Sequence, residues 1–600
     1  MRVLKSQVRS ALDHLIYWRE QHISERYFIL LLALSIGVTM SILANALKYF
    51  IHHVEHFLMQ SIELHSYLYL VLPAVGILLT GAFVRLILKD DISHGVTKVL
   101  SSISQRKSRI KSHNTWSSLL ASGITISFGG SVGAESPIVM TGAAIGSNFG
   151  RLFRLEQRNL MLLVGCGVAG ALGGIFKAPI TGLVFVIEVL LLDLTMASVL
   201  PLLISSVSAA ALSYLISGEA NHFSFTFTEP YYVERLPMMV LLGIICGLVA
   251  LYFSQTMFFL EKRFKKIEPY LSRYVVSVLI LGLLIFLLPP LYGEGYDIVN
   301  KLLTGQYGAL LDNSLFEDFA TSFWVVVGFM ILVLVLKVFA SVATNSGGGC
   351  GGLFAPTLFV GAITGFIYSY IVNYLPFIKM YLPNKNYTLL GMAGLMSAVM
   401  HAPLTGVFLV AELSGGYDLF LPLMLVSMTA FGTIRIFMPH SIYSLRLAEQ
   451  GKLLTHQKDA AVLTLMNVEH VLETDFEVVN PEMTLGDLVR VVSVSHRNSF
   501  PVVNESQKLV GIVELDNIRN IMFRPELYDR PSHIVKHIMV APHTLVRPSM
   551  SMTRIMQIFD ESKEWKLPVV SDTGVYLGFI SKSKIFNNYR SVLNETFIGD

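Results

Sequence analysis

Long apolar runs dominate the hydropathy pattern up to about residue 437. The longest are nearly free of charge and approach the roughly 20 residues that cross a bilayer: Phe28–Leu47, Leu68–Val84, Met238–Leu260, Val275–Leu291 and the shorter Phe323–Leu336. Other runs, Ile138–Phe149 and Leu389–Met400, are shorter and rich in glycine. These predict helices that enter a membrane partway, which is tolerated where protein shields their ends.

The pattern changes after Pro439-His440, and the tail is polar from Thr455. Within the tail a pattern of two short apolar runs occurs twice, at Phe500–Val503 with Leu509–Val513 and at Leu567–Val570 with Tyr576–Ile580. Each copy predicts strand, turn, strand and helix, after an amphipathic helix at Leu485–Val494 or Met552–Glu561. The tail is therefore predicted to be a soluble α/β tandem repeat.

The apolar part also contains a repeat, marked by glycine-proline segments that open apolar stretches. Gly133–Pro137 corresponds to Gly352–Pro356, and at the same offset Gly142-Ala143 corresponds to Gly361-Ala362. Proline suits the first turn of a helix, where its missing N–H costs nothing. Helix starts inside a bilayer present free N–H groups and positive dipole ends, which bind an anion without a buried full positive charge.

Alanine-proline segments form a second repeated pair. Ala178–Gly182 leads to Glu188, and Ala402–Gly406 leads to Glu412. We expect each glutamate to bond to neighbouring helix ends rather than to carry protons.

Composition supports a membrane protein. Of 600 residues, 53% are hydrophobic and only 14% are charged, and the net charge of +3 does not indicate nucleic-acid binding. The charged residues of 1–26 exclude a signal peptide and predict an amphipathic helix on the cytoplasmic surface. Basic clusters at Arg106–Lys111 and Lys262–Lys266 predict cytoplasmic loops. The three cysteines are predicted to be buried packing residues.

These patterns predict the following organisation. After the N-terminal helix, an all-α polytopic membrane domain spans 27–454, with repeats at about 27–215 and 235–437 and a final helix at 441–454. Residues 455–600 form the tail, with its two copies at about 470–525 and 533–592.

Residues 27–450 resemble the CLC family of chloride channels and proton-coupled chloride exchangers. The resemblance rests on Gly133–Pro137, on Gly352–Pro356 and on Tyr443 in Ser441–Ser444; a further family signature is altered here to Ser93–Thr97. The tail resembles a pair of cystathionine-β-synthase (CBS) domains. The resemblance implies inverted repeats with many broken and tilted helices, a homodimer, and one pore per subunit.

Glu135 is the candidate gate. An ionisable side chain in a transmembrane glycine-rich segment is costly and marks function. At a helix start its carboxylate occupies the place of an anion, so chloride and carboxylate compete, and protonation releases the side chain. The structural alternative is a helix-capping glutamate without a transport role.

Backbone N–H groups near the two helix starts and the Tyr443 hydroxyl are the predicted anion ligands. The family resemblance adds the altered signature, so that the candidate anion site comprises His94, Gly95, Val132, Gly133, Ala134, Gly352, Leu353, Phe354, Ala355 and Tyr443. Tyr443 has the alternative of an ordinary interfacial aromatic.

His94 replaces the serine usual in the family. A neutral imidazole donates one hydrogen bond to chloride, whereas imidazolium adds a full charge, so His94 would make anion affinity pH-dependent. The alternative is a histidine bonded to backbone without ligand contact.

Val189 stands where many family exchangers have a second, proton-carrying glutamate. Valine carries no proton, and Glu188 lies about 100° around the helix. The resemblance to family channels, which also have valine here, favours passive conduction, although water chains leave exchange open.

The usual nucleotide-contacting positions of the CBS pair correspond to Glu514, Asn517, Ser581 and Lys584. A glutamate near phosphate is unfavourable, so an adenine nucleotide and a ligand-free dimerising cap are both open. No other cofactor or metal is expected.

The predicted function is therefore transport of chloride, with other small anions and protons as further possible cargo. The protein is expected to be multi-pass in lipid of a plasma or inner membrane, with its tail in the cytoplasm. An enzyme is disfavoured because no catalytic constellation is found. A CBS-regulated cation transporter is disfavoured because the helix starts point positive ends inward.

Overall fold

The computed structural model describes residues 14, 16–64, 67–90, 92, 95–105, 108–190, 196–218, 232–312, 314, 316, 322–376, 380–449, 463, 466–542 and 544–597. The chain divides into two compact units, 1–450 and 451–600. Most of the predicted N-terminal helix and part of the predicted helix at 441–454 lie outside the described residues.

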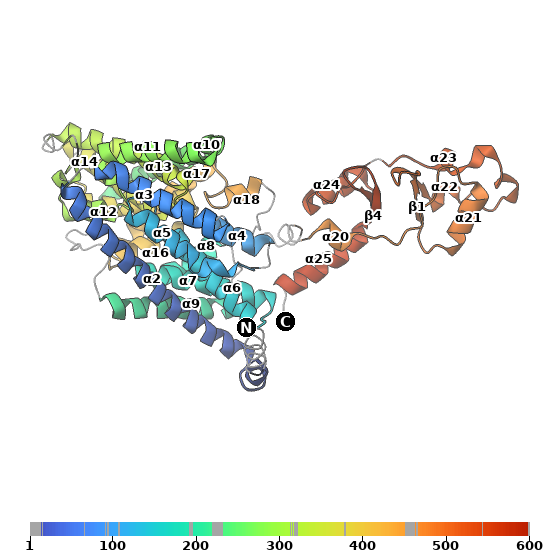
Figure 1. Ribbon diagram of the computed structural model, residues 1–600, viewed down its shortest axis with the longest axis horizontal. Coiled ribbons are helices and arrows are strands. Elements are labelled where there is room, and N and C mark those ends of the chain that lie inside the picture. The colour runs from blue at the N-terminus through green and yellow to red at the C-terminus, as the bar shows by residue number, and fades with distance from the viewer. Residues whose placement is uncertain are drawn as a thin grey trace. The chain divides into compact units, whose positions relative to one another are not determined.

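In the described part of the first unit, the regular secondary-structure elements are all helices (Figure 1). Its helices are α2 (Glu25–Leu64), α3 (Leu68–Ala82), η1 (Phe83–Leu88), α4 (Gly95–Gln105), η2 (Ser112–Thr115), α5 (Ser117–Ser127), α6 (Glu135–Leu152), α7 (Gln157–Phe176), α8 (Pro179–Val189), α9 (Met196–Ser217), η3 (Val233–Arg235), α10 (Leu236–Lys265), α11 (Tyr270–Leu287), η4 (Pro289–Leu291), α12 (Tyr296–Thr304), η5 (Gly308–Leu310), α13 (Phe323–Gly347), α14 (Phe354–Tyr374), α15 (Asn384–Met400), α16 (Pro403–Leu413), α17 (Phe420–Phe437) and α18 (Leu445–Glu449). Among the described residues, nine helices are long and apolar enough to cross a membrane.

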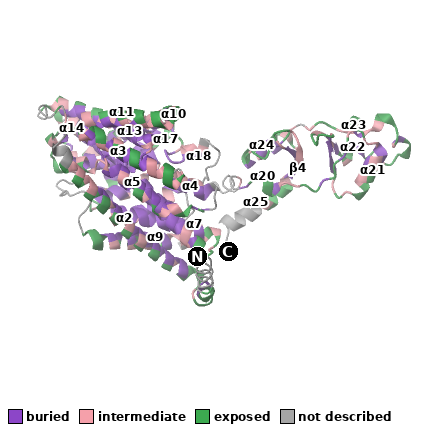
Figure 2. Cartoon of the chain, viewed as in Figure 1, coloured by how far each residue is buried: buried purple, intermediate pink, exposed green. Residues whose placement is uncertain are grey.

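Buried residues concentrate in the central helices, as Figure 2 shows. Nearly all of α15 is buried, and so is most of α6, α7 and α14. The surrounding helices instead expose large apolar side chains such as Leu279 and Leu215. This is the burial pattern of a protein whose solvent is lipid, since lipid tails impose no penalty on exposed leucine.

The two sequence repeats form two equivalent helix arrangements. In the first, α6 packs on α7, which leads into the short α8; in the second, α14 packs on α15, which leads into α16. The close approach requires glycine, because a Cβ on Gly142 would overlap the carbonyl of Gly167 and a Cβ on the corresponding Gly361 would lie 2.6 Å from the carbonyl oxygen of Gly391. The glycines that mark the repeat therefore set the distance between the helices of each pair.

The short helices begin in the same way in both halves. Lys177 and His401 adopt left-handed φ angles of 56° and 54°, which end α7 and α15. Pro179 and Pro403 then occupy the first turns of α8 and α16. A left-handed residue stops a helix, and proline lacks only an N–H that would be unpaired there.

The tail contains two copies of one α/β arrangement. Its elements are α20 (Val468–Val471), α21 (Leu485–Val494), β1 (Ser499–Val503), β2 (Leu509–Glu514), α22 (Leu515–Ile518), η7 (Pro525–Leu527), η8 (Pro531–His533), α23 (Val535–Ile538), α24 (Met552–Ser562), β3 (Lys566–Val570), β4 (Tyr576–Ser581) and α25 (Lys582–Phe597). Strand β1 pairs antiparallel with β2 and β3 with β4, and each hairpin has an irregularity before its last pair. Each copy has its own apolar core, centred on Phe500 or Phe559. The predicted α/β repeat is confirmed.

Candidate functional site

The two glycine-proline segments meet at the centre of the membrane unit. The Gly133 N–H donates to the Gly352 carbonyl at 3.0 Å, and the Gly352 N–H donates to the Gly133 carbonyl at 2.7 Å. These residues occupy equivalent places in the two repeats, so the antiparallel bridge lies on an approximate two-fold axis. The starts of α6 and α14 are therefore brought side by side.

Glu135, the first residue of α6, is 1% exposed. The Tyr296 hydroxyl donates to Glu135 Oε1 at 2.5 Å. The backbone N–H groups of Glu135 and Ala355 also face this carboxylate. Glu135 Oε2 has no hydrogen bond of ordinary geometry within the described part of the chain. The carboxylate thus lies between the two helix starts, where positive dipole ends favour negative charge.

The position of the Glu135 carboxylate requires a residue without a Cβ at Gly133. A Cβ at Gly133 would overlap Glu135 Oε2. A Cβ at Gly352 would lie 2.5 Å from the Ser136 Cβ atom. Both glycines therefore serve close approach, as the motif predicts.

Four of the predicted anion donors are engaged within the protein. The N–H groups of Gly133 and Gly352 form the bridge, and the Ala134 N–H donates to Glu294 Oε1 at 2.8 Å. The Val132 N–H donates to the Gly130 carbonyl. The expectation of free donors at Val132–Ala134 and Gly352 therefore differs from this structure, because a partner segment, a local turn and the Glu294 carboxylate occupy these N–H groups.

Leu353 and Phe354 retain the predicted arrangement at the start of α14. Within the described residues, no hydrogen bond occupies their backbone N–H groups. The Phe354 ring is 2% exposed and stacks on Phe176 with ring centroids 5.2 Å apart. Packing of this ring fixes the orientation of the helix start.

Tyr443 lies buried near the same point. Its side chain is 6% exposed, and its hydroxyl has no hydrogen-bond partner among the described residues. Its charge interaction is with Glu135. A buried hydroxyl without a partner is costly, and an ion at this point would satisfy it.

The altered signature is described only in part. His94 lies outside the described residues. Gly95 begins α4, where a Cβ would overlap the Ser136 carbonyl, and the Val96 N–H donates to Ser136 Oγ at 3.3 Å. Gly95 therefore permits α4 to approach the start of α6.

Sequence reasoning did not identify several charged and polar residues around Glu135. They are Lys48, Glu294, Tyr296 and Lys337. Lys337 is fully buried in α13, and its Nζ donates to the Gly293 carbonyl at 3.2 Å. Lys337 follows directly after a predicted apolar span, so an ionisable residue within the helix was the available signal.

A cavity of about 380 Å³ reaches Glu135. Its lining includes Glu135, Glu294 and Lys48, together with the exposed residues His52 and Asp297. The cavity lies beside η4, which follows the C-terminal end of α11. The basic residues Lys262–Lys266 instead precede the N-terminal end of α11. Since α11 has 18 residues, about 27 Å separates these ends.

The glutamates of the short helices cap the opposite repeat. Glu188 accepts hydrogen bonds from the N–H groups of Leu404 and Thr405 at 2.9 and 2.7 Å. Glu412 accepts from the N–H groups of Ile180 and Thr181, both at 2.9 Å. The expected bonding to neighbouring helix ends is confirmed. Val189 ends α8 and is buried, so no titratable group stands there.

The candidate nucleotide positions in the tail lie at the ends of strands. The Ser499 hydroxyl donates to Glu514 at 2.9 Å, and the Ser581 hydroxyl donates to Glu473. Asn517 lies on α22, and the Lys584 N–H of α25 donates to Ser581 Oγ. The Glu514 carboxylate disfavours a phosphate group at its strand end, whereas Glu473 beside Ser581 is paired with Arg497 at 3.0 Å.

Two helix starts that meet inside an apolar helical unit, a buried carboxylate between them and a tyrosine hydroxyl without a partner among the described residues indicate a polytopic membrane transport protein. The model of the voltage-gated chloride channel (CLC) family matches residues 76–435, and CBS domains match 468–524 and 535–591. The chain belongs to the CLC family and carries a CBS pair.

Curated relatives agree with this assignment. A ClcB-like protein of Ralstonia nicotianae is 30% identical over 395 residues, which cover 63% of this chain and 85% of the relative. The H⁺/Cl⁻ exchange transporter ClcA of Vibrio cholerae is 28% identical, with 52% of this chain and 64% of the relative covered.

Solved structures share the fold. A slow cyanobacterial Cl⁻/H⁺ antiporter has a TM-score of 0.61 at 21% identity, covering 71% of this chain and 98% of that chain. A eukaryotic CLC transporter has a TM-score of 0.58 at 16% identity, covering 94% and 99%.

Proposed function

We propose that this protein conducts chloride passively across a membrane and that protonation of Glu135 gates the path. The observation that carries the proposal is the buried Glu135 carboxylate between the starts of α6 and α14, with the unpaired Tyr443 hydroxyl nearby. A carboxylate in such a place has the charge and the hydrogen-bond requirements of an anion.

The mechanism follows from this competition. Chloride in the path is held by the N–H groups of Leu353 and Phe354 and by the Tyr443 hydroxyl. The N–H groups and the hydroxyl carry only partial positive charges. They bind the ion firmly enough to replace its hydration shell but weakly enough to release it. The ionised Glu135 side chain blocks further passage. Protonation removes its charge, and the side chain then leaves the donors to chloride.

Proton-coupled exchange is the second candidate. It is supported by the carboxylates of Glu294 and Glu135 in one cavity and by the name of the Vibrio cholerae relative. Passive conduction is preferred because Val189 carries no proton from the other side.

The test uses purified full-length protein in liposomes. Chloride efflux is measured against efflux of an impermeant anion, and the reversal potential is measured under a proton gradient. Passive conduction predicts a reversal potential set by the chloride gradient alone. A displacement by the proton gradient supports exchange, and an absence of chloride flux overturns both.

The same proposal includes an assembly and an orientation. In this proposal two copies form a homodimer, and both the end of α10 and the tail lie in the cytoplasm; the basic residues at the end of α10 support this orientation. The cavity that reaches Glu135 then faces the opposite side. The CBS pair acts as a cap between subunits without an adenine nucleotide, so ATP is expected to leave the melting temperature of the whole protein unchanged.

His94 carries a separate hypothesis. If its imidazole contacts the anion, the pH profile of chloride flux changes in His94→Ser. An unchanged profile removes His94 from the anion site.

A further inference from the structure

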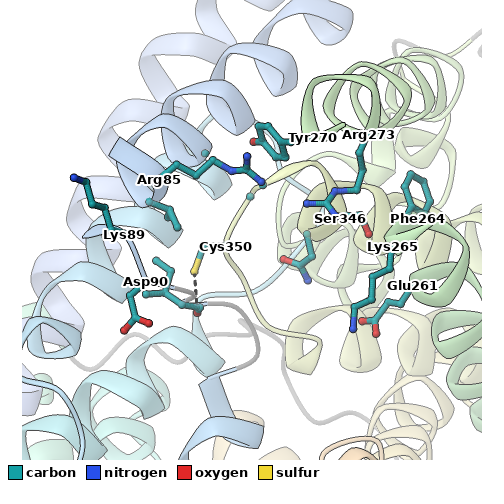
Figure 3. Close-up of a pocket in the computed structure, with 16 residues that line it drawn as sticks. Arg85, Lys89, Asp90, Glu261, Phe264, Lys265, Tyr270, Arg273, Ser346 and Cys350 are labelled. Atoms are coloured by element: carbon teal, nitrogen blue, oxygen red, sulfur yellow. Dashed lines mark hydrogen bonds between the residues drawn. The ribbon is translucent and has the colours of Figure 1, made fainter. Parts of the chain in front are cut away.

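A second cavity lies at the end of the membrane unit that carries the basic residues of α10. Its volume is about 570 Å³, and it lies between the ends of α3 and η1, the end of α10, the start of α11 and residues 345–350 (Figure 3). Four basic side chains line it: Arg85, Lys89, Lys265 and Arg273. The close-up shows the guanidinium groups of Arg85 and Arg273 beside Tyr270, with Lys89 and Lys265 on either side.

The acidic residues of the lining are neutralised from outside it. Asp90 pairs with Lys111 at 2.8 Å and with His113 at 2.9 Å. Glu261 pairs with Arg446. Within the described part of the chain, none of the four basic side chains forms an ion pair. The cavity therefore carries an uncompensated positive charge.

Tyr270 holds two of these charges together. Its hydroxyl donates to the Gly347 carbonyl at 2.9 Å, and any Cβ at Gly81 or Gly348 would overlap that hydroxyl. The Arg85 guanidinium lies 3.0 Å from the ring centroid and that of Arg273 lies 5.6 Å from it. Each guanidinium is attracted to the ring, yet the two repel each other. A multivalent anion would relieve this repulsion.

The surroundings of the cavity point to lipid as the source of that anion. Leu86 and Ile87 of η1 are 74% and 68% exposed, and Leu271 of α11 is 67% exposed. These apolar side chains adjoin Arg85 and Tyr270 in sequence, at helix ends where a bilayer surface is expected. Basic pockets between transmembrane helices on the cytoplasmic side suit anionic headgroups.

We propose that this cavity binds the phosphate-bearing headgroup of an anionic phospholipid, whose acyl chains lie along the exposed apolar side chains of η1 and α11. The lining includes Gly348, Gly349 and Cys350, which lead directly to Gly352 and Leu353 at the anion path. The Cys350 N–H donates to Thr125 Oγ1 at 3.0 Å, so this segment is fixed to α5. A bound headgroup therefore contacts a segment that positions the chloride donors.

The test measures lipid retention and does not depend on transport. Full-length protein is purified from mixed phosphatidylcholine and phosphatidylglycerol micelles, and bound lipid is counted by native mass spectrometry. The variant is Arg85→Gln with Arg273→Gln. Its control is Lys262→Gln with Lys266→Gln, which removes the same charge from exposed residues of the same end. We expect about a tenfold or greater loss of phosphatidylglycerol affinity in the variant and less than a twofold loss in the control.

A single-residue variant tests whether the loss of lipid comes from misfolding, and competition measurements identify the source of the phosphate group. Lys89→Gln alters an exposed side chain, and we expect it to weaken retention by several fold with an unchanged elution profile. Equal retention in the double variant and its control overturns the proposal. Displacement of the lipid by millimolar inorganic phosphate overturns the lipid source, and displacement by chloride identifies the cavity as part of the transport path instead. Lipid retention without chloride flux would leave this proposal standing while the proposed function fails.

Discussion

At the scale of single residues, two carboxylates take different N–H donors at the starts of α6 and α14. Glu135 is held by Tyr296 and faces the N–H groups of Ala355 and of its own backbone. Glu294 takes the Ala134 N–H. Each carboxylate therefore occupies donors that an anion would use, and the two side chains are expected to affect transport differently.

Glu135→Gln removes the charge that competes with chloride. We expect chloride flux in liposomes to become nearly independent of pH, because glutamine does not titrate. The measurement is the flux from pH 4 to 7.5. Asp312→Asn is the control, since Asp312 lines the same cavity but is half exposed. A pH profile that is identical in Glu135→Gln and the unaltered protein would refute the gating role.

Glu294→Ala frees the Ala134 N–H for an anion. We expect chloride affinity to rise by about ten- to 100-fold, because one hydrogen bond to a charged group contributes about 1.5–3 kcal/mol. The measurement is chloride binding by calorimetry in detergent. Glu294→Gln, which keeps an acceptor for the N–H, is the comparison. An equal effect of both variants would show that charge, and not the donor, is responsible.

The sequence located part of this site. Glu135 was found because an acid inside an apolar sequence has few structural explanations, and Tyr443 was found because Ser441–Ser444 resembles a CLC family signature. Glu294 lies in the loop before α12 and Tyr296 is the first residue of α12, about 160 positions after Glu135. No local pattern reports a contact over that distance, so their approach to Glu135 depends on the packing of the helices. The engagement of Gly133 and Gly352 with each other likewise becomes visible only in the fold.

At the scale of elements, helix starts are the functional parts, and each is used differently. The starts of α6 and α14 meet across the glycine bridge and leave donors for an anion. The starts of α8 and α16 are closed by Glu412 and Glu188 from the opposite repeat. Sequence predicted the starts themselves, because proline and glycine act locally, whereas it did not predict which ends would be capped.

Glu188→Gln and Glu412→Gln are expected to reduce stability by similar amounts. Each replaces a carboxylate that accepts two backbone bonds and a threonine hydroxyl bond, so we expect a loss of roughly 2–4 kcal/mol. The measurement is thermal unfolding of the membrane unit in detergent. The double variant Thr181→Val with Glu412→Gln should lose less unfolding free energy than the two single variants lose together, because the two residues are in contact. Strict additivity would show that the Thr181–Glu412 contact contributes nothing.

At the scale of the whole molecule, the chain contains two internal duplications, one in the membrane unit and one in the tail. The membrane repeats exchange contacts around a shared axis, whereas each CBS copy has a separate core. The tail was predictable because alternating apolar strands and amphipathic helices have local signatures. The helices of the membrane unit were predictable as apolar runs, but their bounds were not, since α2 continues to Leu64 through charged and polar residues.

The tail is expected to show a pH dependence that comes from Glu514. Partial burial raises the pKa of Glu514, and the hydrogen bond from Ser499 opposes this only in part. The folded tail therefore holds this proton more tightly than the unfolded chain does. Its unfolding free energy should fall as pH rises above the usual value of 4.5, and the loss should be complete above the raised pKa.

Glu514→Gln removes this dependence. Relative to the unaltered protein, the variant should gain melting temperature between pH 4.5 and 7, with Glu526→Gln as an exposed control. The gain should be small because Glu514 is partly exposed. A constant difference across this pH range would assign the effect to packing.

The reciprocal caps at Glu188 and Glu412 impose an order on biosynthesis. The Ile180 and Thr181 N–H groups leave the ribosome 231 to 232 residues before the glutamate that satisfies them. At a synthesis rate of about 5–20 residues per second, these N–H groups lack their carboxylate acceptor for roughly 12–46 seconds. During that interval the insertion machinery must shield the first repeat from lipid, because lipid contains no hydrogen-bond acceptor for these N–H groups.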